Sequence, residues 1–210
     1  MYENEQKPER VLLVALDFGK GDCEALLDEL AELAKSAGGE VIATMSQKRE
    51  RPDSATYVGS GLMEQARQFC EDNEIDLIIV DDELSPTQQR NMERASGVRV
   101  IDRTLLILDI FASRAQSSEG RIQVELARYR YLLPRLTGQG TGLSRQGGIG
   151  MRRGAGESKL ESDRRHIRRR IHSLEEQLKE VERRRGLLGK RRQKNSLPTV
   201  AIVGYTNAGK

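Results

Sequence analysis

The chain has 210 residues, which is enough for one or two domains, and a formal net charge of only +3 at pH 7. No apolar run approaches the ~18 residues of a membrane-spanning helix, and the N-terminal residues lack the apolar core of a signal peptide. The two cysteines, Cys23 and Cys70, show no metal-ligand spacing. We therefore expect reduced thiols in a cytoplasmic protein, and we expect a monomer.

Charge is distributed unevenly along the chain. Residues 1–120 carry 13 Lys and Arg against 24 Asp and Glu, a net charge of −11. Residues 121–194 carry 21 against 8, a net charge of +13. This asymmetry predicts that the second half of the chain contacts a polyanion while the first half remains in solvent.

The first hundred residues alternate between short apolar runs and amphipathic segments. The apolar runs predict strands over residues 10–16, 41–45, 75–80 and 98–101. Apolar residues at helical spacing predict helices over 22–37 and 62–73, with a polar loop at 46–60. Ser85 and Pro86 predict the N-cap and first position of a further helix, which Gly97 ends. We therefore expect an α/β domain over residues 1–102, with a mainly parallel sheet.

From Arg103 onward the apolar period changes to the 3/4 spacing of a coiled coil. Up to residue 136 the apolar positions are Leu108, Ala112, Ala115, Ile122, Leu126, Tyr129, Leu133 and Leu136, with Glu119 in one gap. After residue 157 they are Leu160, Ile167, Ile171, Leu174, Leu178, Val181 and Leu188, with Arg185 in one core position. Two such helices joined by a loop predict a long antiparallel helical hairpin over residues 103–194, which projects as an arm.

Residues 137–157 form the expected tip of this arm. Eight of these 21 residues are glycine, and little of the segment is apolar. A flexible linker is one interpretation of such a segment, although a plain linker is usually Gly/Ser-rich and uncharged. The interleaved polar residues favour a tip that contacts an anionic partner. We predict RNA-binding roles for Arg145, Gln146, Gly147, Gly148, Arg152 and Arg153.

Arginines crowd the second helix of the predicted arm. The basic excess is larger than the solvation of a helix face requires, and it favours nucleic-acid contact. Few aromatic residues accompany the arginines, so recognition of phosphates and RNA shape is favoured over base stacking. A coiled coil that binds only protein partners is the alternative. The predicted RNA-binding residues of this helix are Arg164, Arg165, Arg168 and Arg169.

The last sixteen residues, 195–210, contain a second recognisable pattern. Residues 199–203 predict a strand, and the next seven fit the phosphate-binding loop pattern G-x-x-x-x-G-K. Glycines in such a loop let backbone N–H groups turn toward the phosphates, while the lysine places a cation on the β and γ phosphates. The predicted nucleotide-binding residues are Gly204, Tyr205, Thr206, Asn207, Ala208, Gly209 and Lys210. We expect these residues to begin a nucleotide-binding domain that is truncated here.

Several short motifs occur together in the second half of the chain. They are Val100-Ile101-Asp102-Arg103-Thr104 followed by Leu106-Ile107-Leu108-Asp109-Ile110-Phe111-Ala112; Gly120 with Gln123-Val124-Glu125-Leu126-Ala127; Gly147-Gly148-Ile149-Gly150; Gly156-Glu157 with Leu160-Glu161; Asp163-Arg164-Arg165; and the eight residues from Val203 to Lys210. In this combination, from about residue 85 to its end, the chain resembles the HflX family of ribosome-associated GTPases.

The resemblance implies an N-terminal α/β subdomain, a helical hairpin and a C-terminal GTPase domain. It implies GTP as the bound nucleotide, with Mg²⁺ held by a hydroxyl just beyond Lys210. It further implies binding to the large (50S) ribosomal subunit and its RNA, with the tip reaching toward the peptidyl transferase centre. The implied activity is GTP-dependent splitting of ribosomes, especially stalled ones under stress. DNA is not an expected partner.

A second nucleotide site in the α/β domain is the alternative hypothesis. Acidic residues follow the third predicted strand, and a glycine-rich turn follows the first, and ligands bind open α/β sheets at these strand ends. Such a site would give an ATP-dependent, helicase-like remodelling of RNA. The candidate residues are Gly19, Lys20, Gly21, Asp81, Asp82 and Glu83.

We predict that residues 1–210 bind no measurable GTP and do not hydrolyse it. A phosphate-binding loop needs the N-terminus of the helix that follows it to hold its N–H groups in place, and that helix is missing here. Titration of fluorescently labelled GTP into the chain tests this. Micromolar binding that the substitution Lys210→Ala abolishes would contradict the prediction.

Overall fold

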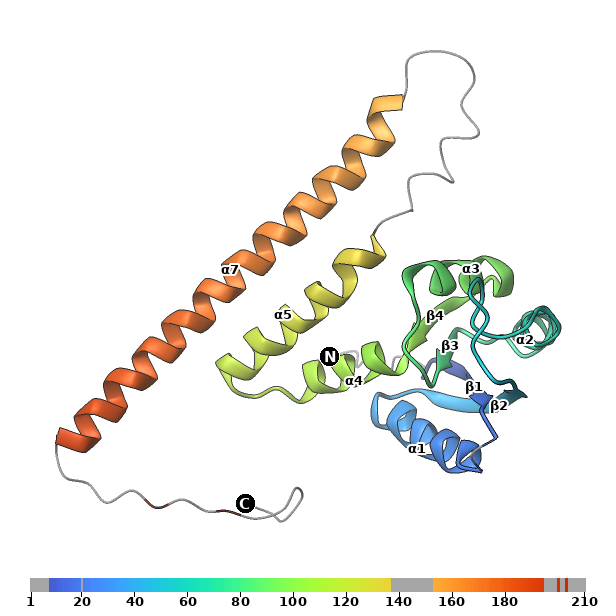
Figure 1. Cartoon of the computed structure of the whole chain (residues 1–210), viewed down its shortest axis with the longest axis horizontal. Helices are drawn as coiled ribbons and strands as arrows, with labels where there is room; N and C mark the ends of the chain where they lie inside the picture. Colours follow the sequence, from blue (N-terminus) through green and yellow to red (C-terminus); the bar gives the residue numbers. More distant parts are fainter. Residues whose placement is uncertain (1–7, 20, 137–152, 195–199, 201–202, 204–210) are drawn as a thin grey trace, which may run out of the picture.

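In a computed structural model of the chain, an α/β unit carries a long helical arm (Figure 1). The structure describes residues 8–19, 21–136, 153–194, 200 and 203, and of residues 153–160 and 191–194 it describes the backbone only. The predicted tip, 137–157, therefore lies almost wholly outside the described residues, and so does the phosphate-binding loop at 204–210. Among the described residues, no helix combines the length and apolar character needed to cross a membrane.

A single four-stranded sheet lies at the centre of the α/β unit. Its strands are β1 (Arg10–Asp17), β2 (Glu40–Lys48), β3 (Leu77–Val80) and β4 (Arg99–Asp102). They are ordered β2-β1-β3-β4, and every neighbouring pair is parallel. This arrangement confirms the predicted α/β class and the parallel sheet. Strand β2 runs three residues into the segment predicted as a loop, because it pairs along the full length of β1.

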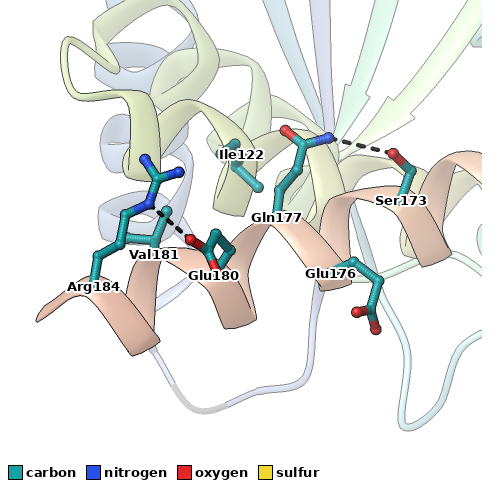
Figure 2. Close-up of a pocket in the computed structure, with 7 residues that line it drawn as sticks. All are labelled: Ile122, Ser173, Glu176, Gln177, Glu180, Val181 and Arg184. Carbon is teal, nitrogen blue, oxygen red and sulfur yellow. Dashed lines mark hydrogen bonds and ion pairs between the residues drawn. The ribbon is translucent and has the colours of Figure 1, made fainter. Parts of the chain in front are cut away.

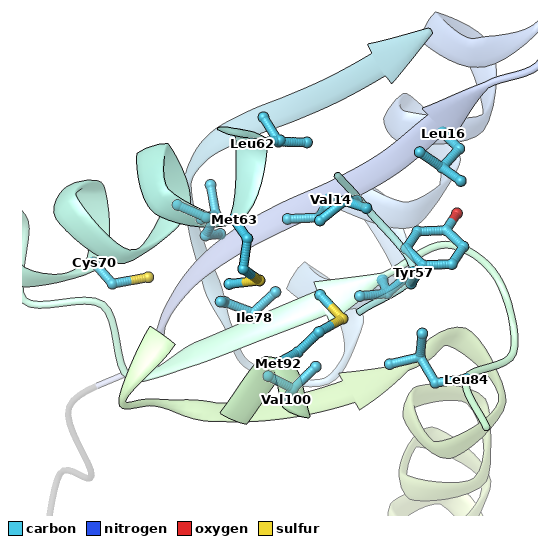
Figure 3. Packing of buried hydrophobic residues seen from close by; sticks show 14 of the residues in the cluster. Val14, Leu16, Tyr57, Leu62, Met63, Cys70, Ile78, Leu84, Met92 and Val100 are labelled. Carbon is cyan, nitrogen blue, oxygen red and sulfur yellow. The ribbon is translucent and has the colours of Figure 1, made fainter. Parts of the chain in front are cut away.

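Helices cover both faces of the sheet. Along β1, Val11, Leu13 and Ala15 face α1 (Cys23–Ser36) and α4 (Arg103–Arg114), because side chains alternate between the two faces of a strand. The intervening residues of β1 face α2 (Ser60–Asp72) and α3 (Pro86–Ser96). Figure 3 shows this second layer, where Met63 and Met92 pack over Ile78 of β3. The result is a three-layer α/β/α unit.

Helix α3 begins and ends at the residues that the sequence predicts. The Ser85 hydroxyl accepts the backbone N–H of Gln88 at 3.2 Å, and the Gln88 side chain accepts the backbone N–H of Ser85 at 2.9 Å. This reciprocal capping box satisfies two N–H groups that the helix cannot pair internally. Gly97 ends the helix with φ of +77°, a left-handed conformation that glycine adopts without steric cost.

The arm is the predicted helical hairpin, built from α5 (Ser118–Arg135) and α7 (Arg153–Lys194). The prediction of one continuous helix from 103 to 136 was wrong, because the chain breaks at 115–117. Ala115 is extended there, and the Ser117 hydroxyl caps α5 by accepting the N–H of Gly120 at 3.0 Å. Helix α4 belongs to the α/β layers, where its apolar face covers the sheet. The domain boundaries at 102 and 194 stay predictions.

We predict that the two thiols differ sharply in reactivity. Burial raises the pKa of Cys70 to about 11 and hides its sulfur in the core of Figure 3, whereas Cys23 is only half-buried. Since the thiolate is the reacting form, a thiol reagent near neutral pH should modify Cys23 first and Cys70 only as the protein unfolds. The Cys23→Ser variant isolates the slow phase. Equal rates of modification of the two thiols in the native protein would contradict the prediction. In denaturant the two thiols should be modified at equal rates, which is the control.

Candidate nucleic-acid interface

Helices α5 and α7 are held together by a narrow apolar seam and by ion pairs across it. Leu174 of α7 is buried to 1% exposure and Leu126 of α5 to 6%. Three ion pairs among the described residues join the helices: Arg130 with Glu175 at 2.7 Å, Arg170 with Glu125 at 2.7 Å and Arg185 with Glu119 at 2.8 Å. Glu119 at the start of α5 pairs late in α7, whereas Glu125 and Arg130 further along α5 pair with earlier residues of α7, so the hairpin is antiparallel as predicted.

The seam is shorter than the apolar period suggests. The predicted positions Ile167, Ile171, Leu178 and Val181 are half-buried around Leu174. Leu188 is 52% exposed, and the Arg185 side chain is 70% exposed and pairs with Glu119 instead of filling a core position. The reason is that α5 begins only at Ser118, so the last residues of α7 extend past the start of their partner helix.

A shallow groove runs between the two helices near the start of α5. It encloses about 460 Å³ and is lined by Ile122 of α5 and by Ser173, Glu176, Gln177, Glu180, Val181 and Arg184 of α7. Figure 2 shows Gln177 bonded to Ser173 and Arg184 bonded to Glu180 along its α7 side. The polar lining atoms are therefore engaged within the helix, and the groove itself offers no convergent set of charges.

The arginines of α7 fall into two groups that differ in their partners. Toward the C-terminal end, Arg183 and Arg184 both bond to Glu180, at 2.7 and 2.9 Å, and these bonds lower the pKa of Glu180 to about 2. Toward the tip, Arg165, Arg168 and Arg169 are exposed and form no ion pair with any described residue. Of these two groups, the tip-proximal one has cations that no described acidic residue neutralises, so they can bind an external anion.

Arg164 belongs to the same tip-proximal group. It is half-buried, forms no ion pair with a described residue, and its Nε has no hydrogen-bond partner in the described part of the chain. A buried donor without a partner is costly, which is consistent with a site that an anion completes. The structure thus groups four of the predicted RNA-binding residues in one segment of α7. The other six, from Arg145 to Arg153, have no described side chains.

The acidic residues of the alternative nucleotide site, after β3, are engaged in contacts within the α/β unit. Asp81 pairs with Arg103 at 2.8 Å; burial raises the pKa of Asp81, and the arginine offsets part of that effect. Asp82 accepts the hydroxyl of Tyr57 at 2.6 Å. Arg103 also bonds to Glu29 of α1. These acidic groups are therefore engaged in ties between β3, α4, α1 and the loop before α2, which accounts for them without a nucleotide.

One charged contact was missed by the sequence analysis. Asp102 at the end of β4 is completely buried, and Arg135 near the end of α5 pairs with it at 3.2 Å. A carboxylate that ends an apolar strand was the available signal, because a buried charge needs a partner. The partner could not be identified, since it lies 33 residues away.

Two family models together cover most of the chain. The first, described as the N-terminal region of GTP-binding GTPases, matches residues 24–112, and the second, described as their middle region, matches residues 114–192. The chain is thus assembled from the α/β unit and the helical arm of a class of GTPases.

Curated relatives named GTPase HflX match the whole chain. The protein of Caldanaerobacter subterraneus is 54% identical over 100% of this chain and 49% of its own length, and that of Escherichia coli is 42% identical over 100% and 49%. The chain belongs to the HflX family of GTPases. It spans about half the length of the curated relatives it matches.

Solved structures share the fold at lower sequence identity. A GTP-binding protein of Sulfolobus solfataricus in complex with GDP is 24% identical, with a TM-score of 0.55 over 83% of this chain and 46% of that chain. A structure described as an SsGBP and GDP complex gives a TM-score of 0.59 over 95% of this chain and 48% of that chain, at 22% identity. An α/β unit with a helical arm is therefore a fold already seen in GTP-binding proteins.

We predict that Leu174→Ala loosens the arm while Leu188→Ala does not. Both substitutions remove the same atoms from the same helix, but Leu174 is 1% and Leu188 52% exposed. Truncating a buried leucine typically costs about 2–5 kcal/mol. Hydrogen exchange of α7 amides should accelerate in the first variant only, with the α/β unit unaffected in both. Equal exchange rates in the two variants would show that the seam does not hold the arm.

Proposed function

We propose that this chain is the ribosome-binding part of a GTPase that binds the large (50S) ribosomal subunit and splits ribosomes, especially stalled ones under stress. The tip-proximal arginines contact phosphates of ribosomal RNA, and the tip itself reaches toward the peptidyl transferase centre. The observation that carries this proposal is the group Arg164, Arg165, Arg168 and Arg169, which form no ion pair with a described residue and lie on an arm that projects from the α/β unit (Figure 1).

The distribution of charge supports this orientation of the molecule. The α/β unit lies within the acidic part of the chain, whose net charge is −11, and the arm carries the basic excess. An anionic surface such as ribosomal RNA attracts the arm and repels the opposite end. The 42 residues of α7 span about 60 Å at 1.5 Å per residue, so the arm is long enough to reach RNA that the α/β unit does not contact.

The nucleotide part of the proposal rests on the family and on the loop pattern. In the full protein, Gly204 to Lys210 bind the phosphates of GTP, and a hydroxyl following Lys210 holds Mg²⁺. Backbone N–H groups at the start of the helix that follows the loop stabilise the phosphate charge. GTP hydrolysis belongs to the nucleotide-binding domain that begins with these residues, and the arm supplies the ribosome contact.

A matched pair of variants tests the RNA contact. Arg168→Gln with Arg169→Gln removes two free cations, whereas Arg183→Gln with Arg184→Gln removes two cations that are paired with Glu180. Because each phosphate contact contributes to counterion release, the first variant should flatten the dependence of log affinity on log salt by about 1.5. The second variant should leave that slope nearly unchanged.

The measurement is binding to large-subunit ribosomal RNA over a series of salt concentrations, with helicity checked for both variants. In the full protein with GTP, the first variant should also lose ribosome splitting. Sedimentation of the ribosomes and their subunits measures that loss. Identical salt slopes for the two variants would remove the tip-proximal arginines from the RNA contact and overturn the proposed role of the arm.

A further inference from the structure

The guanidinium group of Arg135 joins the arm to three parts of the α/β unit. It donates to the backbone carbonyl of Leu84 after β3 at 2.7 Å, to Oδ2 of Asp102 at the end of β4 at 3.2 Å and to Oε1 of Gln89 in α3 at 3.2 Å. The side chain is 10% exposed. It is the last residue of α5, so these contacts lie at the end of the helix that is farther from the connection to α4.

Arg135 is itself held in place from within α5. Its guanidinium carbon lies 3.4 Å from the centroid of the Tyr131 ring, and it donates to the Tyr131 carbonyl at 3.0 Å. Tyr131 is 8% exposed and packs in the apolar cluster beneath the sheet. A guanidinium stacked on an aromatic ring keeps its planar set of donors in one orientation, which a lysine could not reproduce.

The contacts of Arg135 matter for the direction of the arm because of the way in which α5 and α7 are connected to the α/β unit. Helix α5 is joined to α4 through the non-helical residues 115–117, which lie at the start of α5. Helix α7 is tied to the rest of the molecule through α5, because all three of its ion pairs to other described segments go there. Contacts at the start of α5 alone leave the direction of the helix less well defined than contacts at both of its ends, and Arg135 supplies the contacts at the second end.

We propose that Arg135 is the positioning residue that fixes the direction of the arm relative to the α/β unit. Asp102, Leu84 and Gln89 form its receptor, and the receptor lies across β4, α3 and the loop between β3 and α3. The consequence for ribosome binding rests on the function proposed above: an arm held in one direction enters its RNA site without first losing orientational freedom. The geometric claim stands independently of any RNA.

Two other features of α5 could fix the arm instead. One is the apolar packing of Tyr131, and the other is the ion pair between Arg128 of α5 and Asp109 of α4 at 3.4 Å, whose side chains are 49% and 38% exposed. An ion pair so exposed is worth little. Arg128→Met is therefore the matched control for Arg135→Met, because it removes a guanidinium from the same helix and keeps Tyr131 in place.

The test measures the distance between spin labels on the two parts of the molecule. Labels are attached through Gln65→Cys on α2 and His172→Cys on α7, both at exposed positions, in a Cys23→Ser background that leaves buried Cys70 untouched. The parent protein and the Arg128→Met variant should each give a single narrow distance peak by pulsed electron resonance. The Arg135→Met variant should lose that peak and give a broad distribution, with its helicity retained.

A second variant keeps the test decisive if Arg135→Met fails to fold. Asp102→Asn combined with Arg135→Met removes both charges, so no buried carboxylate is left without its counterion. This double variant should fold and should also lose the narrow peak. A narrow peak retained in either folded variant overturns the proposal and assigns the direction of the arm to apolar packing at Tyr131.

The outcome is separable from that of the proposed function. The distance measurement needs no RNA, and the Arg135→Met variant keeps every tip-proximal arginine. In that variant the salt slope of RNA binding should be unchanged, while ribosome splitting by the full protein should be lost. A broad distance distribution together with normal splitting would retain the geometric role of Arg135 and overturn its functional consequence.

Discussion

The architecture depends on one buried carboxylate. Asp102 has no exposed surface and accepts the N–H groups of Leu84 at 3.1 Å and Leu105 at 2.9 Å, together with the guanidinium of Arg135. The Asp102 side chain thus lies at the end of β4, caps α4, binds the loop before α3 and pairs with Arg135 of the arm. Removing one partner of a buried pair typically costs about 3–5 kcal/mol, a large part of the roughly 5–15 kcal/mol by which a domain is stable.

The two parts of the molecule are stabilised in different ways. The α/β unit has apolar clusters on both faces of its sheet, whereas the described part of α7 has one buried side chain, Leu174. The arm therefore depends on the narrow seam around Leu174 together with ion pairs to α5, and exposed ion pairs are individually weak. An arm of this kind is suited to binding a large charged surface, because most of its side chains are not committed to its own core. Arg164, Arg165, Arg168 and Arg169 form no ion pair with a described residue, whereas Arg183 and Arg184 pair with Glu180 within their own helix.

Local physical rules account for what the sequence determined. Apolar runs of strand length predict β1 to β4, and the spacing of leucines and isoleucines predicts the helices, since both depend only on neighbouring residues. Ser85 and Gly97 fix the ends of α3 for the same reason. The division of the chain into an acidic α/β unit and a basic arm follows from composition, and the motifs from Val100 to Lys210 were sufficient to suggest the HflX family.

Only the tertiary structure decided which residues are partners. The break at 115–117 separates α4, which packs on the sheet, from α5, which packs on α7. The apolar period continues through residue 136 and therefore did not indicate this break. Likewise, Arg169 and Arg170 are neighbours in the sequence, and among the described residues only Arg170 forms an ion pair across the hairpin, with Glu125 of α5. Asp102 and Arg135 are separated by 33 residues and by a change of helix. Local periodicity carries no information about such contacts, because their formation depends on how the helices pack in three dimensions.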